Sequence, residues 1–358
     1  MISHVFKILV TGAGGTAGVN FIRSITLSNK YYVIGTERNK YHTLFPNVKK
    51  METIPNHSDP LYITQLKKIL KNNSVDFLHP QPTPEMHMIA KNRESLDVKT
   101  VLPRTEIVTM SKLDQQRVLE KQSVPVAKTI VLESDSDLSE IKDKITFPVW
   151  VRAKRGAGGR LSNKCSSVEE VMHWIRLCVM QGKASVQDFI IQEFLGGRDI
   201  AYDSIWYQGK LVASYCRERL EYPFSNLTPS GITGTPTVAK IVHEKKMNSV
   251  AESAIKAIDS NPHGCYSVDM KENGGVPTIT EVDSGKFHTT IGLWGYIAIK
   301  HLKLPESYSL PNLYLSLALE GDMPNMPKYD IYPEIYLLRH IDCGAWITDW
   351  DGIKEKVL

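Results

Sequence analysis

Three acidic side chains in the second half of the chain are the residues best suited to chemistry. Asp269 lies in one apolar run, and Glu281 and Asp283 alternate along the next. The glycine-containing segment between the runs predicts a hairpin, so strand pairing can bring Asp269 beside the other two carboxylates. Three carboxylates on one partly buried face repel each other unless a cation lies between them, and hard oxygen ligands suit a magnesium ion that bridges phosphates. A solvated sheet face explains any single acid equally well, but explains all three less well.

A strand that carries cations and runs into glycines could hold a nucleotide. Residues 147–153 include Arg152, and Gly156, Gly158 and Gly159 follow. Such a glycine hairpin can fold over a triphosphate, with backbone amides and cations meeting its charge. A basic surface turn is an equally good interpretation of this segment alone. Because no Walker loop is present in the sequence, ATP would have to be held in this other way.

A second strand could supply the adenine and ribose contacts. Residues 190–192 lead through Glu193 and the two residues after it into Gly196-Gly197. An extended segment that leaves a strand can offer backbone groups to an adenine edge, and Asp199 could bond the ribose hydroxyls. A strand followed by two glycines is common, so this pattern is weak by itself.

The glycine-rich segment 12–18 near the N-terminus gives a competing signal. Glycines between a strand and a helix can turn their amides toward a phosphate, and Glu37 ends the next strand, where a ribose-binding acid would lie. An NAD-dependent short-chain oxidoreductase would also need a Tyr-x-x-x-Lys pair, and the one such pair, Tyr296 and Lys300, comes far too late. A turn that packs a helix on a strand is therefore the favoured interpretation.

Composition limits the class of protein. The chain has 358 residues, a net charge of +4 and five cysteines without a Cys-x-x-Cys pair. The small charge argues against a nucleic-acid partner, and the cysteine pattern against a disulfide framework or a zinc site. No stretch approaches the ~20 apolar residues of a membrane span, and the N-terminal apolar run is too short for a signal peptide. We expect a cytoplasmic enzyme without a membrane partner.

Periodicity predicts alternating strands and helices, hence an α/β fold with a parallel sheet at the N-terminus. Strands are expected at residues 7–11, 31–35, 75–78, 129–132, 147–153, 190–192, 200–207, 211–216, 265–270 and 278–282. Helices are expected after the first glycine segment and at residues 61–70, 111–122, 168–179 and 245–258. The proline-rich segment 79–84 is read as a loop, and the last fifty residues are not assigned to a separate domain.

Together and in this order, the motifs over residues 5–300 resemble the ATP-grasp superfamily, in particular proteins similar to the carbamoyl-phosphate synthase large chain. The resemblance implies a Rossmann-like pre-ATP-grasp domain followed by a two-lobed ATP-grasp α+β domain. The implied parts are residues 1–105, a lid-bearing N-lobe at 106–188, a C-lobe with the metal site at 189–305, and a C-terminal extension at 306–358. The first part usually helps to hold the non-nucleotide substrate in that family.

The resemblance also implies roles for single residues. It implies phosphate binding by Lys112 and Arg152, the second of which also has a catalytic role with Lys286, and metal ligation by Asp269, Glu281 and Asp283. The other nucleotide contacts it implies are Gly156, Gly158, Gly159, Gln192, Glu193, Phe194, Leu195, Asp199 and Thr233. Ser111, Asp199, Asp283 and Lys286 depart from the residues usual at these positions, and Lys offers a point charge where the family's Arg offers a fork.

The function implied is a ligase that uses ATP and Mg²⁺ (Mn²⁺ could substitute) to join a small-molecule carboxylate to an amine, or to a thiol, through an acyl phosphate. Alternatives are an enzyme of the carbamoyl-phosphate type that uses bicarbonate and ammonia, an NAD-dependent oxidoreductase, and a non-catalytic ATP sensor. The substrate pocket is expected to use the loop 79–85, Arg217, Arg219 and the segment 339–342, although solvent-facing ion pairs are the favoured interpretation of the two arginines. A homodimer is compatible with the Tyr-rich tail.

Overall fold

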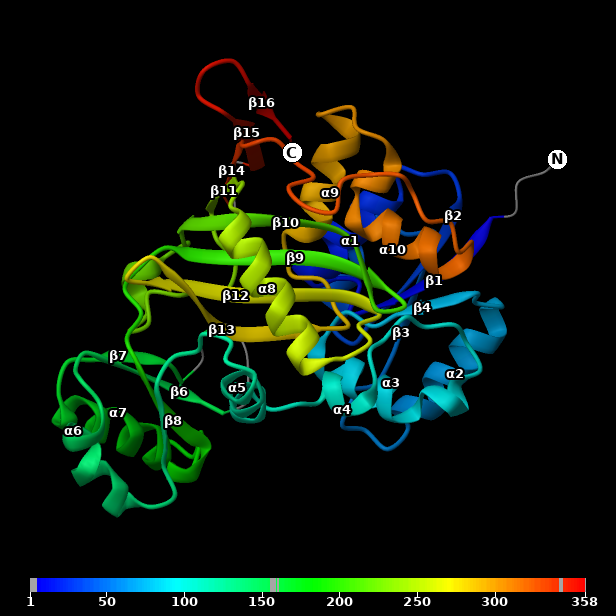
Figure 1. The fold of residues 1–358 in the computed structure, drawn as a ribbon. Coiled ribbons are helices and arrows are strands. Elements are labelled where there is room, and N and C mark those ends of the chain that lie inside the picture. Colours follow the sequence, from blue (N-terminus) through cyan, green and yellow to red (C-terminus); the bar gives the residue numbers. More distant parts are fainter. Residues whose placement is uncertain (1–4, 155–158, 160, 341–343, 358) are drawn as a thin grey trace.

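The computed structural model describes residues 5–154, 159, 161–340 and 344–357. Within these residues the chain forms three sheets, seen in Figure 1 as two neighbouring bodies and a smaller lobe set apart at the lower left. Every helix in the described part is too short or too polar to span a bilayer.

The N-terminal sheet has four parallel strands in the order β3-β2-β1-β4. Its strands are β1 (Phe6–Thr11), β2 (Tyr31–Glu37), β3 (Lys50–Thr53) and β4 (Phe77–His79). Helices α1 (Thr16–Ile25), α2 (Tyr62–Asn73), α3 (Thr83–Leu96) and α4 (Thr105–Val108) accompany it. Successive residues of β1 enter different cores, Leu9 on one face and Ile8 and Val10 on the other, as expected of a parallel strand covered on both sides.

The central sheet has eight strands in the order β13-β12-β9-β10-β11-β14-β15-β16. Their bounds are β9 (Asp199–Tyr207), β10 (Lys210–Glu221), β11 (Val238–Val242), β12 (Gly264–Asn273), β13 (Val276–Ser284), β14 (Tyr336–His340), β15 (Gly344–Thr348) and β16 (Lys354–Lys356). Helix α8 (Lys245–Ile258) crosses one face and buries Met247, Ala251 and Ile255, which recur at helical spacing. The hairpin of β12 and β13 confirms the pairing expected from the sequence.

The small lobe is a four-stranded sheet in the order β5-β8-β6-β7, backed by α7 (Val168–Met180) and α6 (Ile141–Lys144). Its strands are β5 (Thr129–Val131), β6 (Val149–Ala153), β7 (Asn163–Cys165) and β8 (Phe189–Glu193). Helix α5 (Lys112–Lys121) lies between this lobe and the edge strand β13 (Figure 1). The domain boundary expected at residue 189 falls just before β8, but β8 pairs with β5 and β6 and so belongs to the small lobe.

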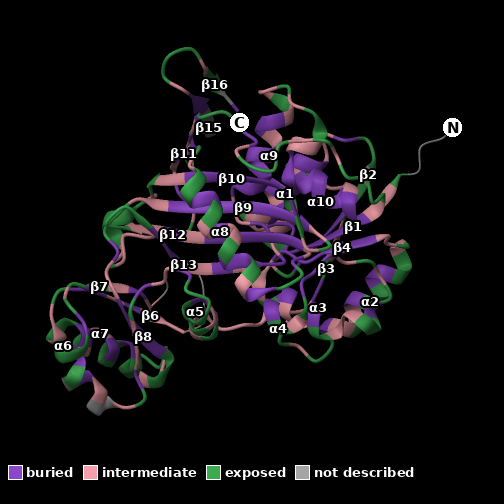
Figure 2. Ribbon diagram, viewed as in Figure 1, coloured by how far each residue is buried: buried purple, intermediate pink, exposed green. Residues whose placement is uncertain are grey.

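The C-terminal residues join the two larger bodies. Helices α9 (Ile291–Lys300) and α10 (Leu310–Leu319) pack against each other and against α1, and Figure 2 shows both largely buried. Strand β14 pairs with β11, so the last segment extends the central sheet. Among the described residues, the 3-10 turns are η1 (Lys40–Leu44), η2 (Asp135–Glu140), η3 (Val186–Asp188), η4 (Ser225–Leu227) and η5 (Glu306–Tyr308).

Candidate active site

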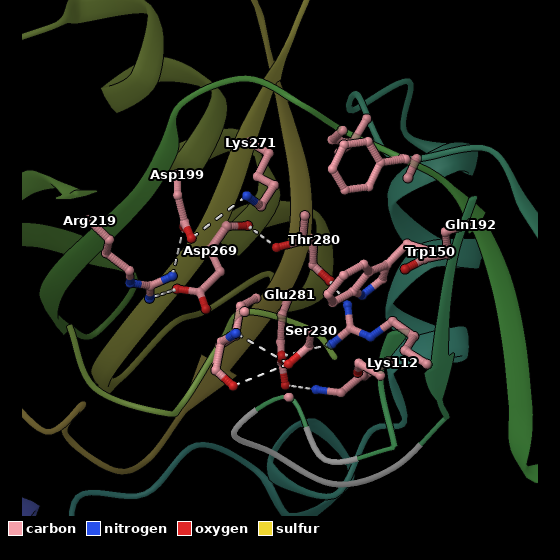
Figure 3. Close-up of a pocket in the computed structure, with 18 of the residues that line it drawn as sticks. Lys112, Trp150, Gln192, Asp199, Arg219, Ser230, Asp269, Lys271, Thr280 and Glu281 are labelled. Carbon is pink, nitrogen blue, oxygen red and sulfur yellow. Dashed lines mark hydrogen bonds and ion pairs between the residues drawn. The ribbon is translucent and has the colours of Figure 1, made fainter. Parts of the chain in front are cut away.

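A cavity of about 430 Å³ lies between the small lobe and the edge of the central sheet. The small lobe contributes Trp150, Arg152, Gly159 and the segment from Gln192 to Leu195, and the central sheet contributes Asp199, Asp269 and Glu281. The loop after β10 adds Ser230, Gly231, Ile232 and Gly234. Figure 3 shows the acids and cations on the sheet side facing Trp150 and Gln192 across the hollow.

The segment after β8 is fixed by its own side chains. Gln192 is buried, and its Nε2 donates to Gln116 Oε1 at 3.0 Å and to Thr129 Oγ1 at 2.9 Å. The Glu193 carboxylate accepts from the Lys128 amide at 2.9 Å. The side chains of Gln192 and Glu193 are thus bound to residues of α5 and of the small lobe. Phe194 and Leu195 present backbone and apolar surface to the cavity, and such a surface suits a flat heteroaromatic ring. The Trp150 and Phe194 rings lie 6.4 Å apart between centroids.

Two cations from different elements meet on Glu281. Lys112, at the start of α5, hydrogen-bonds and pairs with Glu281 Oε1, and Arg152 on β6 donates from Nη2 to Oε2 at 3.2 Å and from Nη1 to the Thr280 carbonyl at 3.2 Å. Burial, reinforced by the charge of Arg152, lowers the pKa of Lys112 to about 7. Burial also lowers the pKa of Arg152 to about 10. Desolvation therefore destabilises both the Lys112 ammonium and the Arg152 guanidinium, and an incoming polyanion would relieve this.

Asp269 and Glu281 are cross-strand partners at this edge of the sheet. Arg219 bridges two acids, with Nη2 donating to Asp269 Oδ1 at 2.5 Å and Nη1 to Asp199 Oδ1 at 3.0 Å. Burial raises the pKa of Asp269, but Arg219 and His288 together outweigh it and hold that pKa below its usual range. Asp199 also accepts from the Tyr222 hydroxyl at 3.1 Å. Asp269 is thus held as a carboxylate beside Arg219.

A second cavity of about 470 Å³ opens on the other side of the same acids. Asp269 and Glu281 line both cavities, whereas Asp283 and Lys286 line only the second. Lys286 Nζ lies 3.4 Å from Asp283 Oδ2, and His288 Nε2 lies 2.9 Å from the same oxygen. Burial raises the pKa of Asp283, but Lys286 and His288 outweigh it and leave that pKa well below its usual range.

The first glycine segment and the proline-rich segment line this second cavity, through Gly12, Gly15, Thr16, Gln81 and Pro82. The Glu37 carboxylate is buried and accepts from the amides of Gly14, Arg38 and Asn39 at 3.2, 3.0 and 3.1 Å. These three hydrogen bonds hold the loop in place. They leave the Glu37 carboxylate poorly placed to bind a ribose, as an NAD site would require.

The expectation that Arg217 and Arg219 face solvent is wrong. Arg217 is 2% exposed, and Arg219 has a side chain that is 10% exposed. Arg217 Nε donates to Asp203 Oδ2 at 2.9 Å, and Asp203 is fully buried. The alternation of residues along the strand predicted that both arginines lie on one face of the sheet. It could not predict that acidic residues of the neighbouring strands lie on the same face and pair with them. The same alternation would have added Lys271, two residues after Asp269, which lines the first cavity and was not expected there.

Other expected site residues lie elsewhere. Thr233 is not among the residues lining either cavity, because its hydroxyl bonds the Pro223 carbonyl. Arg339 and His340 lie on β14 and line neither cavity. Gly156 and Gly158 of the glycine loop, and Ile341 and Asp342 of the C-terminal segment, lie outside the described residues.

The donor set suits Mg²⁺ held jointly with phosphates. Asp269 and Glu281 present hard oxygens at one place, and Mg²⁺ is commonly bound through one or two carboxylates plus substrate phosphates. Across residues 5–154, 159, 161–340 and 344–357, no group of three or more His, Cys, Asp or Glu side chains is arranged to hold an ion by itself. Asp283 pairs with Lys286 and His288 in the second cavity and does not line the first.

Known proteins resemble this chain in part of its sequence and in its fold. No family model matches the chain. A D-alanine–D-alanine ligase from Christiangramia forsetii is 24% identical over 189 residues, which cover 47% of this chain and 56% of that protein, so the chain matches about half the length of this relative.

Solved structures match over almost the whole chain. L-amino acid ligase from Bacillus licheniformis has a TM-score of 0.67 at 12% identity, covering 94% of this chain and 80% of its own. N5-carboxyaminoimidazole synthetase from Staphylococcus aureus, complexed with ADP, has a TM-score of 0.68 at 12% identity, covering 95% and 84%. The biotin carboxylase domain of 2-oxoglutarate carboxylase from Hydrogenobacter thermophilus, in complex with MgADP and bicarbonate, has a TM-score of 0.69 at 13% identity, covering 94% and 75%.

Proposed function

The chain has the fold of the ATP-grasp superfamily, and from this premise we propose that it is an ATP- and Mg²⁺-dependent ligase that joins a small-molecule carboxylate to an amine through an acyl phosphate. The observation that carries the proposal is that two cavities meet at Asp269 and Glu281. One cavity has the features of a nucleotide site and the other those of a substrate site, with paired carboxylates and cations between them.

In the proposed complex, ATP occupies the first cavity. The backbone at Phe194 and Leu195 meets the adenine edge, and Asp199 accepts from the ribose hydroxyls. The triphosphate extends toward Lys112 and Arg152, which exchange part of their contact with Glu281 for phosphate oxygens. Desolvated cations gain most from a polyanion, and so these two residues supply much of the binding free energy.

Asp269 and Glu281 are the proposed holders of Mg²⁺, with Asp283 a less direct contributor from the second cavity. The ion would neutralise phosphate charge and orient the γ-phosphoryl group. Mn²⁺ would also be accepted, since it takes the same oxygen ligands. The Glu281 carboxylate, freed by the movement of Lys112 and Arg152 toward phosphates, would become available to the metal.

The proposed reaction runs from the second cavity toward the first. A carboxylate oxygen of the substrate attacks the γ-phosphorus, the bond from that phosphorus to the bridging oxygen breaks, and ADP leaves. Arg152 and Lys286 stabilise charge on the transferring group from its two sides. The amine nitrogen then attacks the acyl carbon, phosphate leaves, and the nitrogen loses a proton. Proximity of the two cavities supplies the positioning that this chemistry needs.

The other candidates have less support. An NAD-dependent oxidoreductase would need a ribose-binding acid in its nucleotide site, and Glu37 is buried, accepts from three amides and lines neither cavity. A synthase of the carbamoyl-phosphate type would use two ATP-grasp halves, and the described residues form one such unit. An ATP sensor would use the first cavity alone, and would leave the carboxylate-binding features of the second without a purpose. A homodimer is compatible with the fold.

The test is acid-dependent formation of an acyl hydroxamate. The protein is incubated with ATP, Mg²⁺, hydroxylamine as a general acceptor and a panel of carboxylic and amino acids, and ADP and hydroxamate are measured together. Equal amounts of ADP and hydroxamate, both requiring Mg²⁺ and one class of acid, are expected. ATP binding without ADP formation for any acid would favour the sensor and contradict the ligase.

A further inference from the structure

The second cavity contains a polar subsite that the phosphoryl-transfer chemistry does not use. Arg217 lines this cavity from β10, and its Nε is engaged by Asp203. Its Nη1 is buried and has no hydrogen-bond partner among the described residues. Thr290, 1% exposed at the start of α9, lines the same cavity and has a hydroxyl oxygen that is likewise unpartnered in the part of the chain described. Unsatisfied buried donors are costly, so two in one cavity point to a missing acceptor.

Asp203 engages the Nε edge of the Arg217 guanidinium. Asp203 is fully buried, does not line the cavity, and its other oxygen accepts from Ser267 at 2.8 Å. Asp203 therefore binds the guanidinium through Nε, and Nη1 of Arg217 stays without a partner in the described residues. The other two fixed cations of the cavity are occupied, Arg219 by Asp199 and Asp269 and Lys286 by Asp283. Within the described lining of this cavity, Arg217 has a buried nitrogen, Nη1, that lacks a hydrogen-bond partner.

The N-terminus of α1 opens onto the same cavity. Gly15, Thr16, Ala17 and Gly18 line it, and the first intrahelical hydrogen bond is donated by Val19 to the Gly15 carbonyl. No side chain caps this ten-residue helix, and its first turn carries no acidic residue. The backbone amides of Thr16, Ala17 and Gly18 therefore have no acceptor within the helix. The helix dipole places a partial positive charge at this end, where an anion is stabilised.

From these observations we infer that the carboxylate substrate carries a second anionic group, which binds between the α1 N-terminus and Arg217 while the reacting carboxylate lies beside Asp269 and Glu281. The inference rests on the proposed function. A carboxylate and a phosphate monoester share the required chemistry, since either accepts from backbone amides and from a guanidinium edge. The substrate class is therefore dicarboxylic acids or phosphorylated carboxylic acids.

Gly15 offers a clean way to test the subsite. It precedes α1 with φ −72° and ψ 155°, the conformation of an N-cap residue, and a Cβ there would meet only the Gly12 carbonyl oxygen, at 3.4 Å. In Gly15→Asp the new carboxylate caps the helix and repels an anion, whereas Gly15→Asn caps the helix without charge. Both variants are expected to fold, and their melting temperatures check this. Arg217→Lys is the second probe, because it keeps the charge beside Asp203 and loses the fork.

The experiment compares straight-chain monocarboxylic acids of three to eight carbons with the dicarboxylic and ω-phosphorylated acids of the same lengths, by ADP release with hydroxylamine. In the wild type, kcat/KM for the best acid with two anionic groups should exceed that of its monoanionic counterpart by roughly tenfold to a hundredfold. Gly15→Asp and Arg217→Lys should reduce this ratio about tenfold, and Gly15→Asn should reduce it less.

The two series of diacids distinguish a carboxylate from a phosphate as the second group. Equal kcat/KM for mono- and dianionic acids, or a ratio unchanged in Gly15→Asp, would overturn the inference while leaving the ligase intact. Absence of ADP release with every acid would overturn the proposed function, and the inference with it.

Discussion

Asp269 on β12 stands directly opposite Glu281 on β13, and both carboxylates face the two cavities at once. Lys112 and Arg152 reach Glu281 from the small-lobe side, and Arg219 reaches Asp269 from the central sheet. The pair is therefore a junction at which a nucleotide phosphate, a cation and a second substrate could meet.

Removing either acid should abolish turnover with little change in fold. Asp269→Ala and Glu281→Ala are expected to reduce ADP formation by about a hundredfold or more, because phosphoryl transfer is catalysed mainly by positioning and by electrostatic stabilisation. Activity is measured in Mg²⁺ together with melting temperature. Glu272→Gln, on β12 but outside both cavity linings, is the matched control. Full activity in either alanine variant would refute the metal assignment.

The cations should act on the nucleotide. Lys112→Met and Arg152→Met are each expected to weaken binding of ATP with Mg²⁺ roughly tenfold or more, since a charge-assisted hydrogen bond to phosphate is lost. Isothermal titration calorimetry with ATP measures this, and adenosine is titrated in parallel. A similar loss for adenosine would mean that the variants disturb the cavity as a whole and would contradict a phosphate role.

Trp150 should report on the nucleotide. Its side chain lines the first cavity, whereas Trp174 on α7 bonds the Leu161 carbonyl and lies outside both linings. Added ATP is expected to change the tryptophan emission of the wild type and of Trp174→Phe, and to change that of Trp150→Phe much less. An unchanged response in Trp150→Phe would place the nucleotide away from this cavity.

His79 should make stability depend on pH. It is fully buried, stacks on Phe21 at 4.1 Å and bonds Gln81 at 3.0 Å, and burial lowers its pKa to about 4. The unfolded chain binds a proton near pH 6.5, before the folded one does. The titration of His79 therefore leaves the free energy of unfolding unchanged above about pH 6.5. It lowers that free energy by at most about 3 kcal/mol as the pH falls toward 4.

Urea unfolding of the wild type and of His79→Phe at several pH values measures this effect. The difference in free energy of unfolding between the two proteins should change over that pH interval and be constant above it. A difference that is constant from pH 4 to pH 7 would contradict a buried neutral histidine.

Local pattern was sufficient for the parts of the fold with clear periodicity. The bounds of α8 are those expected, and the hairpin that carries Asp269 and Glu281 was predicted from alternation and its glycine turn. Helix α3 was missed because Pro84 was read as a breaker, although proline is well tolerated in the first turn of a helix. Helices α9 and α10 gave no signal, since they are apolar on nearly all sides.

The candidate site was predictable only where its residues lie on one local pattern. The burial of Arg217 depends on Asp203 of a neighbouring strand, and the use of the first glycine segment by the second cavity depends on how the N-terminal body meets the central sheet. Both are long-range contacts that a single strand or helix does not encode. Asp283 lines only the second cavity, where it pairs with His288, which lies beyond the end of β13.

The central claim is tested most directly by thermal unfolding with ATP plus Mg²⁺, ATP plus EDTA, and NADH, each run separately. A ligand that binds only the folded state at about a hundred times its Kd adds about 2.7 kcal/mol of stability. We expect the melting temperature to rise by several degrees with ATP in a Mg²⁺-dependent way, and to be unchanged by NADH. A rise with NADH alone would show that the N-terminal glycines form the cofactor site and would contradict the ligase.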